Sequence, residues 1–336
     1  MRKSITHNYT NPIFFAAAIM VACLAFVLFN CSTTGEKGES VSDENYKQLF
    51  KQSYRICNPP IPEELSFAGE VVPIDNYMVR EMLERELLVN TYWQSNILLL
   101  AKRCYRYFPI IEPILEKNNV PEDFKYLCVI ESSLTNCVSP AKAAGFWQFM
   151  PTTGKEYGME VGTEVDQRFD LAIATEAACK YLKNQYNTFK NWSLVALSYN
   201  AGLGGISSRL ADQQVSSAYD LALNQETGRY LFRIMAAKLI LENPEMYGIC
   251  MRHKDLYQPI ETKVVTVNTG IANLSSFAIA NGINLKTLKA FNPWLRSSKL
   301  TNAQHKTYNI LIPTTSSSYA KQIEDNPKSD ELWTGF

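Results

Sequence analysis

The chain has 336 residues, of which 46% are hydrophobic and 12% aromatic, so it carries enough apolar side chains to fill a core and is not a disordered chain. This length predicts two domains rather than one. Lysine plus arginine and aspartate plus glutamate both number 33, so the formal net charge is zero and we expect no nucleic-acid partner.

The first 30 residues have the pattern of a secretory signal peptide. A basic start is followed by residues 13–29, which are 17 positions without a charge. The segment Leu28-Phe29-Asn30-Cys31 resembles a lipobox, at which the signal peptide is cleaved and the cysteine is acylated. We therefore expect lipidation at Cys31 and a membrane partner through this anchor. Cys23 is a weaker candidate, and an uncleaved transmembrane anchor is the alternative.

The residue after this cysteine is Ser32, which is not acidic, and this favours the periplasmic side of the outer membrane in the cell envelope. Residues 31–76 are expected to form a tether and an N-terminal extension. An exported chain can form disulfides, but the sequence leaves their pairing open. The cysteines downstream of the anchor are Cys57, Cys104, Cys128, Cys137, Cys179 and Cys250.

Residues 77–250 are expected to form one mainly helical domain, because their apolar residues recur at three- and four-residue steps. A break at Asn118-Asn119 and a proline at position 121 predict a helix over 121–131, since proline suits the first helical position. Glycines at 202, 204 and 205 are expected to stop the helix before them. The other helical segments that we expect are 77–117, 146–158, 170–189, 191–200 and 224–242.

The composition changes after residue 248. Residues 262–313 have the order strand, helix, helix, strand, which predicts a separate small βααβ domain. The valines at 264, 265 and 267 indicate its first strand, and the segment 308–312 indicates its last. Residues 314–336 are expected to form a loose tail.

The chemistry of the larger domain is limited by the residues that it lacks. Histidine occurs only at positions 7, 253 and 305, so a Ser-His-Asp or Cys-His nucleophile and a histidine-based zinc site are excluded between residues 8 and 252. No glycine-rich phosphate loop is present. Carboxylates remain for acid–base work, and we expect no metal and no cofactor.

Glu131 is the carboxylate that the predicted helix geometry singles out. Phe124, Leu127 and Cys128 occupy positions i, i+3 and i+4 of the 121–131 helix, and Glu131 is i+7 on the same apolar stripe. Burial disfavours the ionised form and raises the pKa of a carboxyl, as a general acid working near neutrality requires. The ordinary alternative is a solvated or capping glutamate at a helix end.

Three short motifs are weak signals when taken separately, but their order along the chain is specific: Glu131-Ser132, Gly145-Phe146-Trp147-Gln148 and Tyr199-Asn200-Ala201-Gly202. In this order they resemble the soluble lytic transglycosylase superfamily, in which phenylalanine 146 would replace the usual leucine. Residues 165–170 and 226–230 resemble two further elements of that family. With the upstream helices, the match over 77–250 is most similar to the membrane-bound lytic murein transglycosylases of the D type.

The resemblance implies a lysozyme-like fold and cleavage of the MurNAc–GlcNAc β-1,4 bond of peptidoglycan, with 1,6-anhydroMurNAc ends as products. Glu131 would be the one catalytic carboxylate, and the N-acetyl group of the substrate would replace the second carboxylate of ordinary glycosidases. The residues that it places at the substrate or beside this carboxyl are Ser132, Ser133, Gln148, Met150, Tyr199, Asn200 and Tyr230. Each of them has a purely structural role as its alternative.

The aspartates at positions 166 and 170 flank Arg168, and we interpret the three as a loop ion-pair network rather than as a source of a second catalytic acid. Residues 262–313 resemble a LysM module, a fold that binds N-acetylated glycans. This sequence departs from the family at Gly270-Ile271-Ala272-Asn273, where Gly-Asp-Thr-Leu is usual.

Two other functions remain open at this point. A lysozyme-type muramidase could use the same fold with water as the attacking group, since fold alone does not decide the chemistry. A non-catalytic wall-binding lipoprotein belongs to a different class, and the presence of Glu131 and of the Tyr199-Asn200 segment argues against it.

Overall fold

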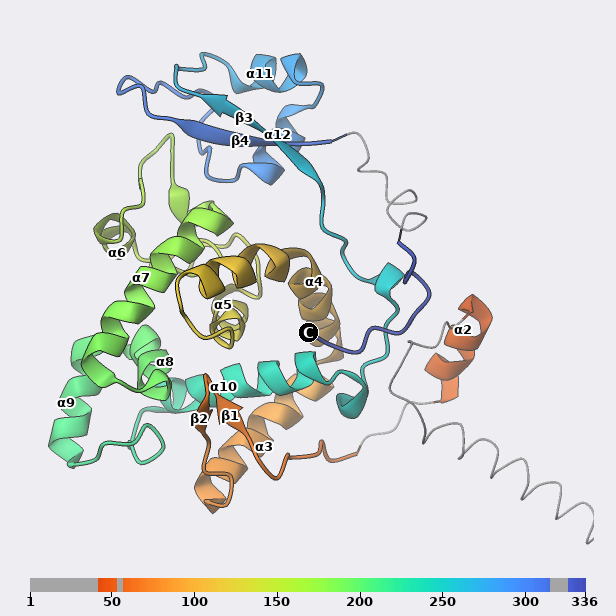
Figure 1. The fold of residues 1–336 in the computed structure, drawn as a ribbon, viewed down its shortest axis with the longest axis vertical. Helices are drawn as coiled ribbons and strands as arrows, with labels where there is room; N and C mark the ends of the chain where they lie inside the picture. Colours follow the sequence, from red (N-terminus) through yellow and green to blue (C-terminus); the bar gives the residue numbers. More distant parts are fainter. Residues whose placement is uncertain (1–41, 53–56, 315–325) are drawn as a thin grey trace, which may run out of the picture. The chain divides into compact units, whose positions relative to one another are not determined.

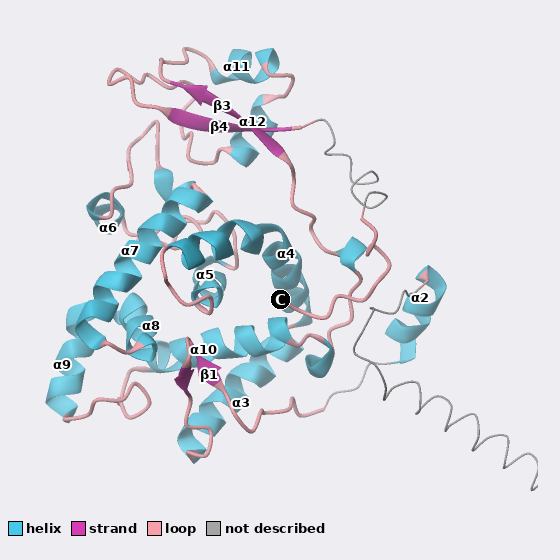
Figure 2. Cartoon of the chain, viewed as in Figure 1, coloured by secondary structure: helices cyan, strands magenta, loops and turns pink. Residues whose placement is uncertain are grey.

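A computed structural model of the chain describes residues 42–52, 57–314 and 326–336. The expected signal peptide and the lipidation site Cys31 lie outside these residues. Helices dominate the described part, with two short pairs of strands (Figure 2), so the prediction of a mainly helical fold is confirmed. None of the helices described here combines the length and the apolar character that crossing a bilayer demands.

The core of the large domain begins upstream of residue 77, the expected boundary. Helix α2 (Asp43–Gln52) is followed by a small antiparallel hairpin of β1 (Ser66–Phe67) and β2 (Glu70–Val71). Phe67 is fully buried in the main hydrophobic cluster, and Val72 and Ile74 join it. Part of the predicted N-terminal extension is therefore part of the folded core.

Helices α3 (Tyr77–Tyr92) and α4 (Gln94–Lys117) are separated by the single residue Trp93. Helix α5 (Phe124–Ser132) comes next and begins three residues later than predicted, because residues 121–123 form a turn. The Asp123 carboxylate does not cap this helix. It accepts a hydrogen bond from the Ala68 amide at 2.6 Å and pairs with Lys238 instead.

The next helices confirm three predicted segments, shorten a fourth and add one that was not predicted. Helices α7 (Leu171–Phe189), α8 (Trp192–Ala201) and α10 (Gln225–Glu242) lie within two residues of their predicted bounds. Helix α6 (Pro151–Glu156) is shorter than the predicted 146–158, since residues 145–148 form a turn. Helix α8 ends at Gly202 as predicted, but α9 (Leu203–Gln213) follows at once, so the glycines at 204 and 205 lie inside a helix that the sequence did not predict.

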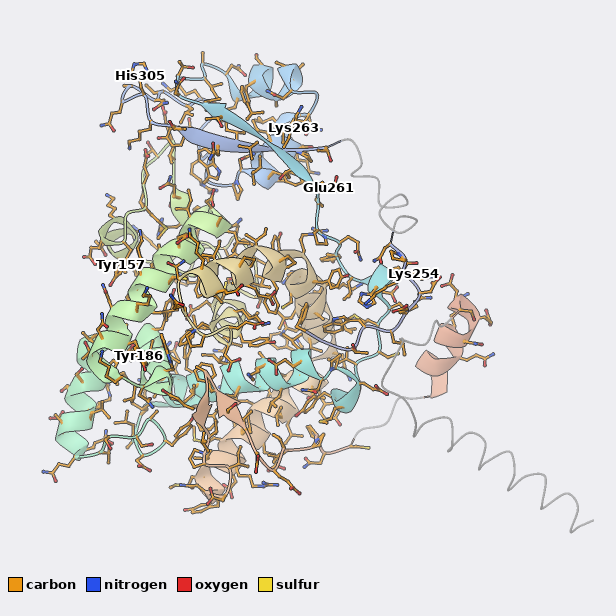
Figure 3. The ribbon with its side chains drawn as sticks, viewed as in Figure 1. Tyr157, Tyr186, Lys254, Glu261, Lys263 and His305 are labelled. Atoms are coloured by element: carbon orange, nitrogen blue, oxygen red, sulfur yellow. The ribbon has the colours of Figure 1, made fainter. Side chains whose placement is uncertain are left out.

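Helix α5 lies within a ring formed by α4, α7, α8 and α10 (Figure 1). Its apolar residues fill the centre of the main hydrophobic cluster, where Phe124, Leu127 and Cys128 are fully buried. Tyr186 of α7, labelled in Figure 3, stacks on Trp192 of α8 with ring centroids 4.1 Å apart. The ring of helices thus holds the end of α5 in a fixed place.

The small domain has the predicted order. Strand β3 (Thr262–Val267) pairs antiparallel with β4 (Tyr308–Pro313), with Val265 opposite Ile310. Helices α11 (Leu274–Ala280) and α12 (Leu285–Phe291) lie between the strands in sequence. Two short 3-10 helices, η2 (Glu245–Tyr247) and η3 (His253–Asp255), precede this domain.

The prediction of a loose tail is wrong for residues 326–336. Trp333 is 4% exposed and belongs to the main hydrophobic cluster. Its amide donates to the Met251 carbonyl at 2.8 Å, and the His253 amide donates to the Glu331 carbonyl at 3.0 Å. The Phe336 ring contacts that of Phe108 with centroids 4.8 Å apart. Apolar side chains near the end of the chain therefore complete the core of the large domain.

Candidate active site

Glu131 lies in the last turn of α5, where the helix leaves the core. The buried stripe beneath it places its half-buried carboxyl against apolar neighbours rather than in open solvent. Ser133 ends the helix in the left-handed conformation (φ 52°), and its amide donates to the Val129 carbonyl at 2.8 Å. Arg103 of α4 donates to the Ser133 carbonyl at 3.0 Å and fixes this turn.

Tyr230 of α10 donates a hydrogen bond from its buried hydroxyl to Oε1 of Glu131. Burial raises the pKa of Glu131 from the ordinary 4.5 to about 7, and nearby Glu226 adds to the increase. The hydrogen bond from Tyr230 and the charge of Arg233 act in the opposite direction without cancelling it. A carboxyl with a pKa near 7 can give up a proton and take one back near neutral pH.

Tyr199 of α8 is held next to this carboxyl by a bond to the loop beneath it. Its hydroxyl donates to the Trp147 carbonyl at 2.7 Å, and its ring contacts that of Phe149. Burial raises the pKa of Tyr199 well above its usual value, and the charge of Glu131 raises it further. Tyr199 therefore supports the 145–149 turn beside the carboxyl as a neutral phenol.

Gln148 has a left-handed backbone (φ 49°), and its side chain is used within its own loop. Its amide nitrogen donates to the Gly145 carbonyl at 2.7 Å and to the Cys137 carbonyl at 3.2 Å. Gly145 has φ 80°, and a Cβ there would lie 1.8 Å from the Arg168 carbonyl oxygen. Only glycine fits this turn, for both conformational and steric reasons.

Arg168 and Asp166 form the buried ion pair that the sequence predicted, with Nη2 2.7 Å from Oδ2. The guanidinium also donates from Nη1 to the carbonyls of Lys142 and Phe149, at 2.9 and 3.0 Å. Asp170 is not part of this network. It caps α7 by accepting from the Ile173 amide at 3.0 Å. The ion pair thus ties the 142–149 loop to the segment before α7.

Of the remaining residues predicted at the site, two form hydrogen bonds within the protein and one is exposed. The buried Ser132 hydroxyl donates back to the Cys128 carbonyl at 3.4 Å. Asn200 accepts from the Thr227 hydroxyl at 2.9 Å, which joins the end of α8 to the start of α10. Met150 is 41% exposed at the start of α6. The structure brings Tyr230 to the Glu131 carboxyl and uses Ser132, Asn200 and Gln148 within the protein.

The sequence reasoning missed the electrostatic neighbours of Glu131 on α10. Glu226, Tyr230 and Arg233 are spaced i, i+4 and i+7, so they share one face of the helix. This helical spacing from Tyr230 is the signal by which the sequence indicates both charged residues. Among the described residues, no group of three or more His, Cys, Asp and Glu side chains is arranged to hold a metal ion.

A buried ion pair that the sequence analysis did not predict also fixes the position of α10. Glu86 of α3 is fully buried, and Nε of Arg229 lies 2.6 Å from its Oε1. Arg229 directly precedes Tyr230, so this pair fixes the position of the helix that carries the tyrosine. The signal for it was a glutamate on the apolar stripe of α3, between Leu83 and Leu87, which are themselves fully buried.

A half-buried glutamate that titrates near neutrality is suited to acid–base chemistry, and comparison with known families shows which class of enzyme the domain belongs to. The family described as "Transglycosylase SLT domain" matches residues 108–221. The family described as "Soluble lytic transglycosylase C-terminal LysM-like domain" matches residues 263–316. The chain is therefore an enzyme of the lytic transglycosylase class with a LysM-like C-terminal domain.

Over 338 aligned residues the chain is 27% identical to "Membrane-bound lytic murein transglycosylase D" of Escherichia coli strain K12, with 94% of this chain and 71% of that protein covered. The protein of the same name from Escherichia coli O6:H1 gives the same identity and coverage. The similarity thus includes the segments before and between the two matched domains.

Proposed function

We propose that this chain cleaves the β-1,4 bond between N-acetylmuramic acid and N-acetylglucosamine in peptidoglycan and leaves 1,6-anhydro-N-acetylmuramic acid ends. The observation that carries the proposal is the Glu131 carboxyl, whose pKa is raised to about 7 by burial and which accepts a hydrogen bond from Tyr230. The substrate is supported by the two matched domains and by the name of the similar murein enzymes.

In the first step, the protonated Glu131 carboxyl gives its proton to the glycosidic oxygen, and the bond to C1 of the muramic acid breaks. The N-acetyl group of the substrate stabilises the positive charge that develops at C1. In the second step, the Glu131 carboxylate takes the proton of the C6 hydroxyl, whose oxygen closes onto C1. The attack is intramolecular and uses no water, so it benefits from proximity. One carboxyl that titrates near neutrality serves both steps.

Tyr230 has a defined part in this scheme. Its hydroxyl stabilises the carboxylate that forms after the first proton transfer, because it donates to Oε1. Without this bond the carboxyl would hold its proton more tightly, since the bond lowers the pKa that burial raises. Tyr199 and Gln148 maintain the loop beside the carboxyl through the bonds described above.

The chain is proposed to act at the cell envelope as a lipoprotein anchored through Cys31. This part rests on the sequence of residues 28–31 and on the similarity to enzymes named as membrane-bound. A serine after the cysteine favours the periplasmic side of the outer membrane. Metabolic labelling with a clickable fatty acid tests it: label on the wild type and none on Cys31→Ala is expected, and equal label on both would refute the site.

The test of the reaction is mass spectrometry of the soluble products from purified peptidoglycan. Wild-type enzyme is expected to release anhydro-muropeptides, and Glu131→Gln is expected to lower the rate by about 10²-fold or more, as for loss of a general acid. Glu116→Gln, at an exposed site on α4, is the matched control and should retain full activity. Products with reducing ends would indicate a muramidase, and no products with retained wall binding would indicate a binding protein.

A further inference from the structure

The LysM-like domain is joined to the catalytic domain by backbone pairing. The Asp166 amide donates to the Trp294 carbonyl at 2.9 Å, and the Arg296 amide donates to the Glu164 carbonyl at 2.8 Å. Val165 lies between these two bonds and forms an isolated antiparallel bridge with Leu295. Such pairing fixes the two segments in register, which a flexible tether would not do.

Apolar side chains continue the contact. Ala144, Val165 and Phe169 are at most 4% exposed and belong to the same hydrophobic cluster as Leu288, Leu295 and the other core residues of the small domain. The guanidinium carbon of Arg296 lies 4.1 Å from the centre of the Phe169 ring. The core of the small domain is therefore closed by residues of the large one, and undocking would expose this surface to water.

Two glutamates of the large domain form hydrogen bonds to the small domain beside this apolar contact. The Glu164 carboxylate accepts from the Thr301 amide and hydroxyl, at 2.7 and 2.8 Å. The Glu160 carboxylate accepts from Lys306 and from the Tyr308 hydroxyl, both at 2.9 Å. Each carboxylate thus has two donors in the small domain.

The contact between the two domains continues to the 142–149 loop, which is bonded to Tyr199, a neighbour of Glu131. Asp166, whose amide bonds to the small domain, also holds the guanidinium of Arg168. That guanidinium donates to the carbonyls of Lys142 and Phe149, at the two ends of the loop that contains Gln148. Ala144, within the loop, packs in the cluster of the small domain. The loop is therefore fixed from outside the catalytic domain.

We propose that the LysM-like domain is a fixed brace of the active site, with Glu160 and Glu164 as positioning residues that hold the 142–149 loop in its catalytic geometry through Asp166 and Arg168. The proposal rests on the proposed function for its kinetic consequence, but the docking can be measured without activity. A brace affects turnover on every substrate, whereas a binding module affects only polymers long enough to reach it.

The test uses the full chain with Glu160→Lys and Glu164→Lys combined, which places like charges opposite Lys306 and Lys299. Hydrogen exchange is expected to increase in peptides covering 142–149 and 164–168. On a soluble fragment of two disaccharide units, kcat is expected to fall about 10-fold to 100-fold with little change in KM, since a small displacement of catalytic groups has effects of this order.

Two further variants control for charge and for folding. Adding Lys299→Glu and Lys306→Glu re-forms the ion pairs and should recover part of the lost kcat, while the bonds from Thr301 stay broken. The exposed pair Glu63→Lys and Glu64→Lys makes the same charge change and should alter neither exchange nor kcat.

Increased exchange at 164–168 with unchanged exchange at 142–149 and unchanged kcat on the short fragment would overturn the proposal. Unchanged exchange in both segments would show that the two glutamates do not hold the domain and would overturn it equally. A wild type that is inactive on both the fragment and purified peptidoglycan, with the exchange changes present, would contradict the proposed function but leave the docking intact.

Discussion

Replacing Glu131 with glutamine is expected to stabilise the fold at neutral and alkaline pH while it removes activity. The half-buried carboxyl has a pKa of about 7, against the ordinary 4.5. This difference corresponds to about 3 kcal/mol of unfavourable free energy when the carboxyl is ionised within the folded protein. Glutamine keeps the size of the side chain and an oxygen that can accept from Tyr230, but it is never charged.

The pH window follows from the sign of the pKa change. Below pH 4.5 the carboxyl is protonated in both the folded and the unfolded chain, so the two proteins should differ little in stability. Between pH 4.5 and about 7 the folded chain keeps the proton that the unfolded chain loses. The wild type then loses stability by up to about 1.4 kcal/mol per pH unit from this group. Above pH 7 the advantage of Glu131→Gln should stay near its maximum.

Urea unfolding of wild type and Glu131→Gln at a series of pH values from 4 to 8 measures this difference directly. Glu116→Gln is the control, because its side chain is exposed and its substitution should change stability little at any pH. A stability difference between wild type and Glu131→Gln that does not change with pH would refute the argument that burial raises the pKa of this carboxyl.

Three other substitutions test separate parts of the structure. Tyr230→Phe removes the hydrogen bond that lowers the pKa of Glu131, so the fall of kcat/KM at alkaline pH should move to higher pH. A pH–rate profile whose alkaline side stays in place would contradict this. Gly145→Ala places a Cβ against the Arg168 carbonyl and should destabilise the fold by about 1 to 3 kcal/mol or more in urea unfolding. The loss should exceed that of Gly158→Ala, which has a positive φ of 91° as well but whose Cβ meets no neighbour. Trp333→Ala should cost about 3 to 5 kcal/mol in the same assay, and a loss below about 1 kcal/mol would mean that the last residues are not part of the core.

Regular periodicity made much of the fold predictable from the sequence. The stripe of Phe124, Leu127 and Cys128 is buried as predicted, and Glu131 faces an apolar environment. The stripe did not predict that α5 is buried on its other sides too, where Lys125 and Tyr126 are at most 2% exposed. The order of strands and helices in the small domain followed from local patterns in the same way. Helix periodicity is a local property, which is why these elements could be read without the tertiary structure.

The errors arose where distant segments decide the local structure. Asp123 was expected within the first turn of a helix, but its carboxylate bonds to Ala68 and pairs with Lys238, both more than 50 positions away. Trp333 lies in a stretch with no regular pattern, and it is buried because residues 326–336 pack against the large domain. The role of Gln148 within its own loop depends on the left-handed turn at residues 145–148, which the motif alone does not define.

In the proposed reaction, Glu131 directs attack by the sugar's own C6 hydroxyl instead of by water. Digestion of purified peptidoglycan in water enriched in oxygen-18, followed by mass spectrometry, tests this most directly. We expect anhydro products without the heavy isotope from the wild type and none above background from Glu131→Gln. Reducing-end products that carry one oxygen-18 would show that water attacks C1 and would contradict it.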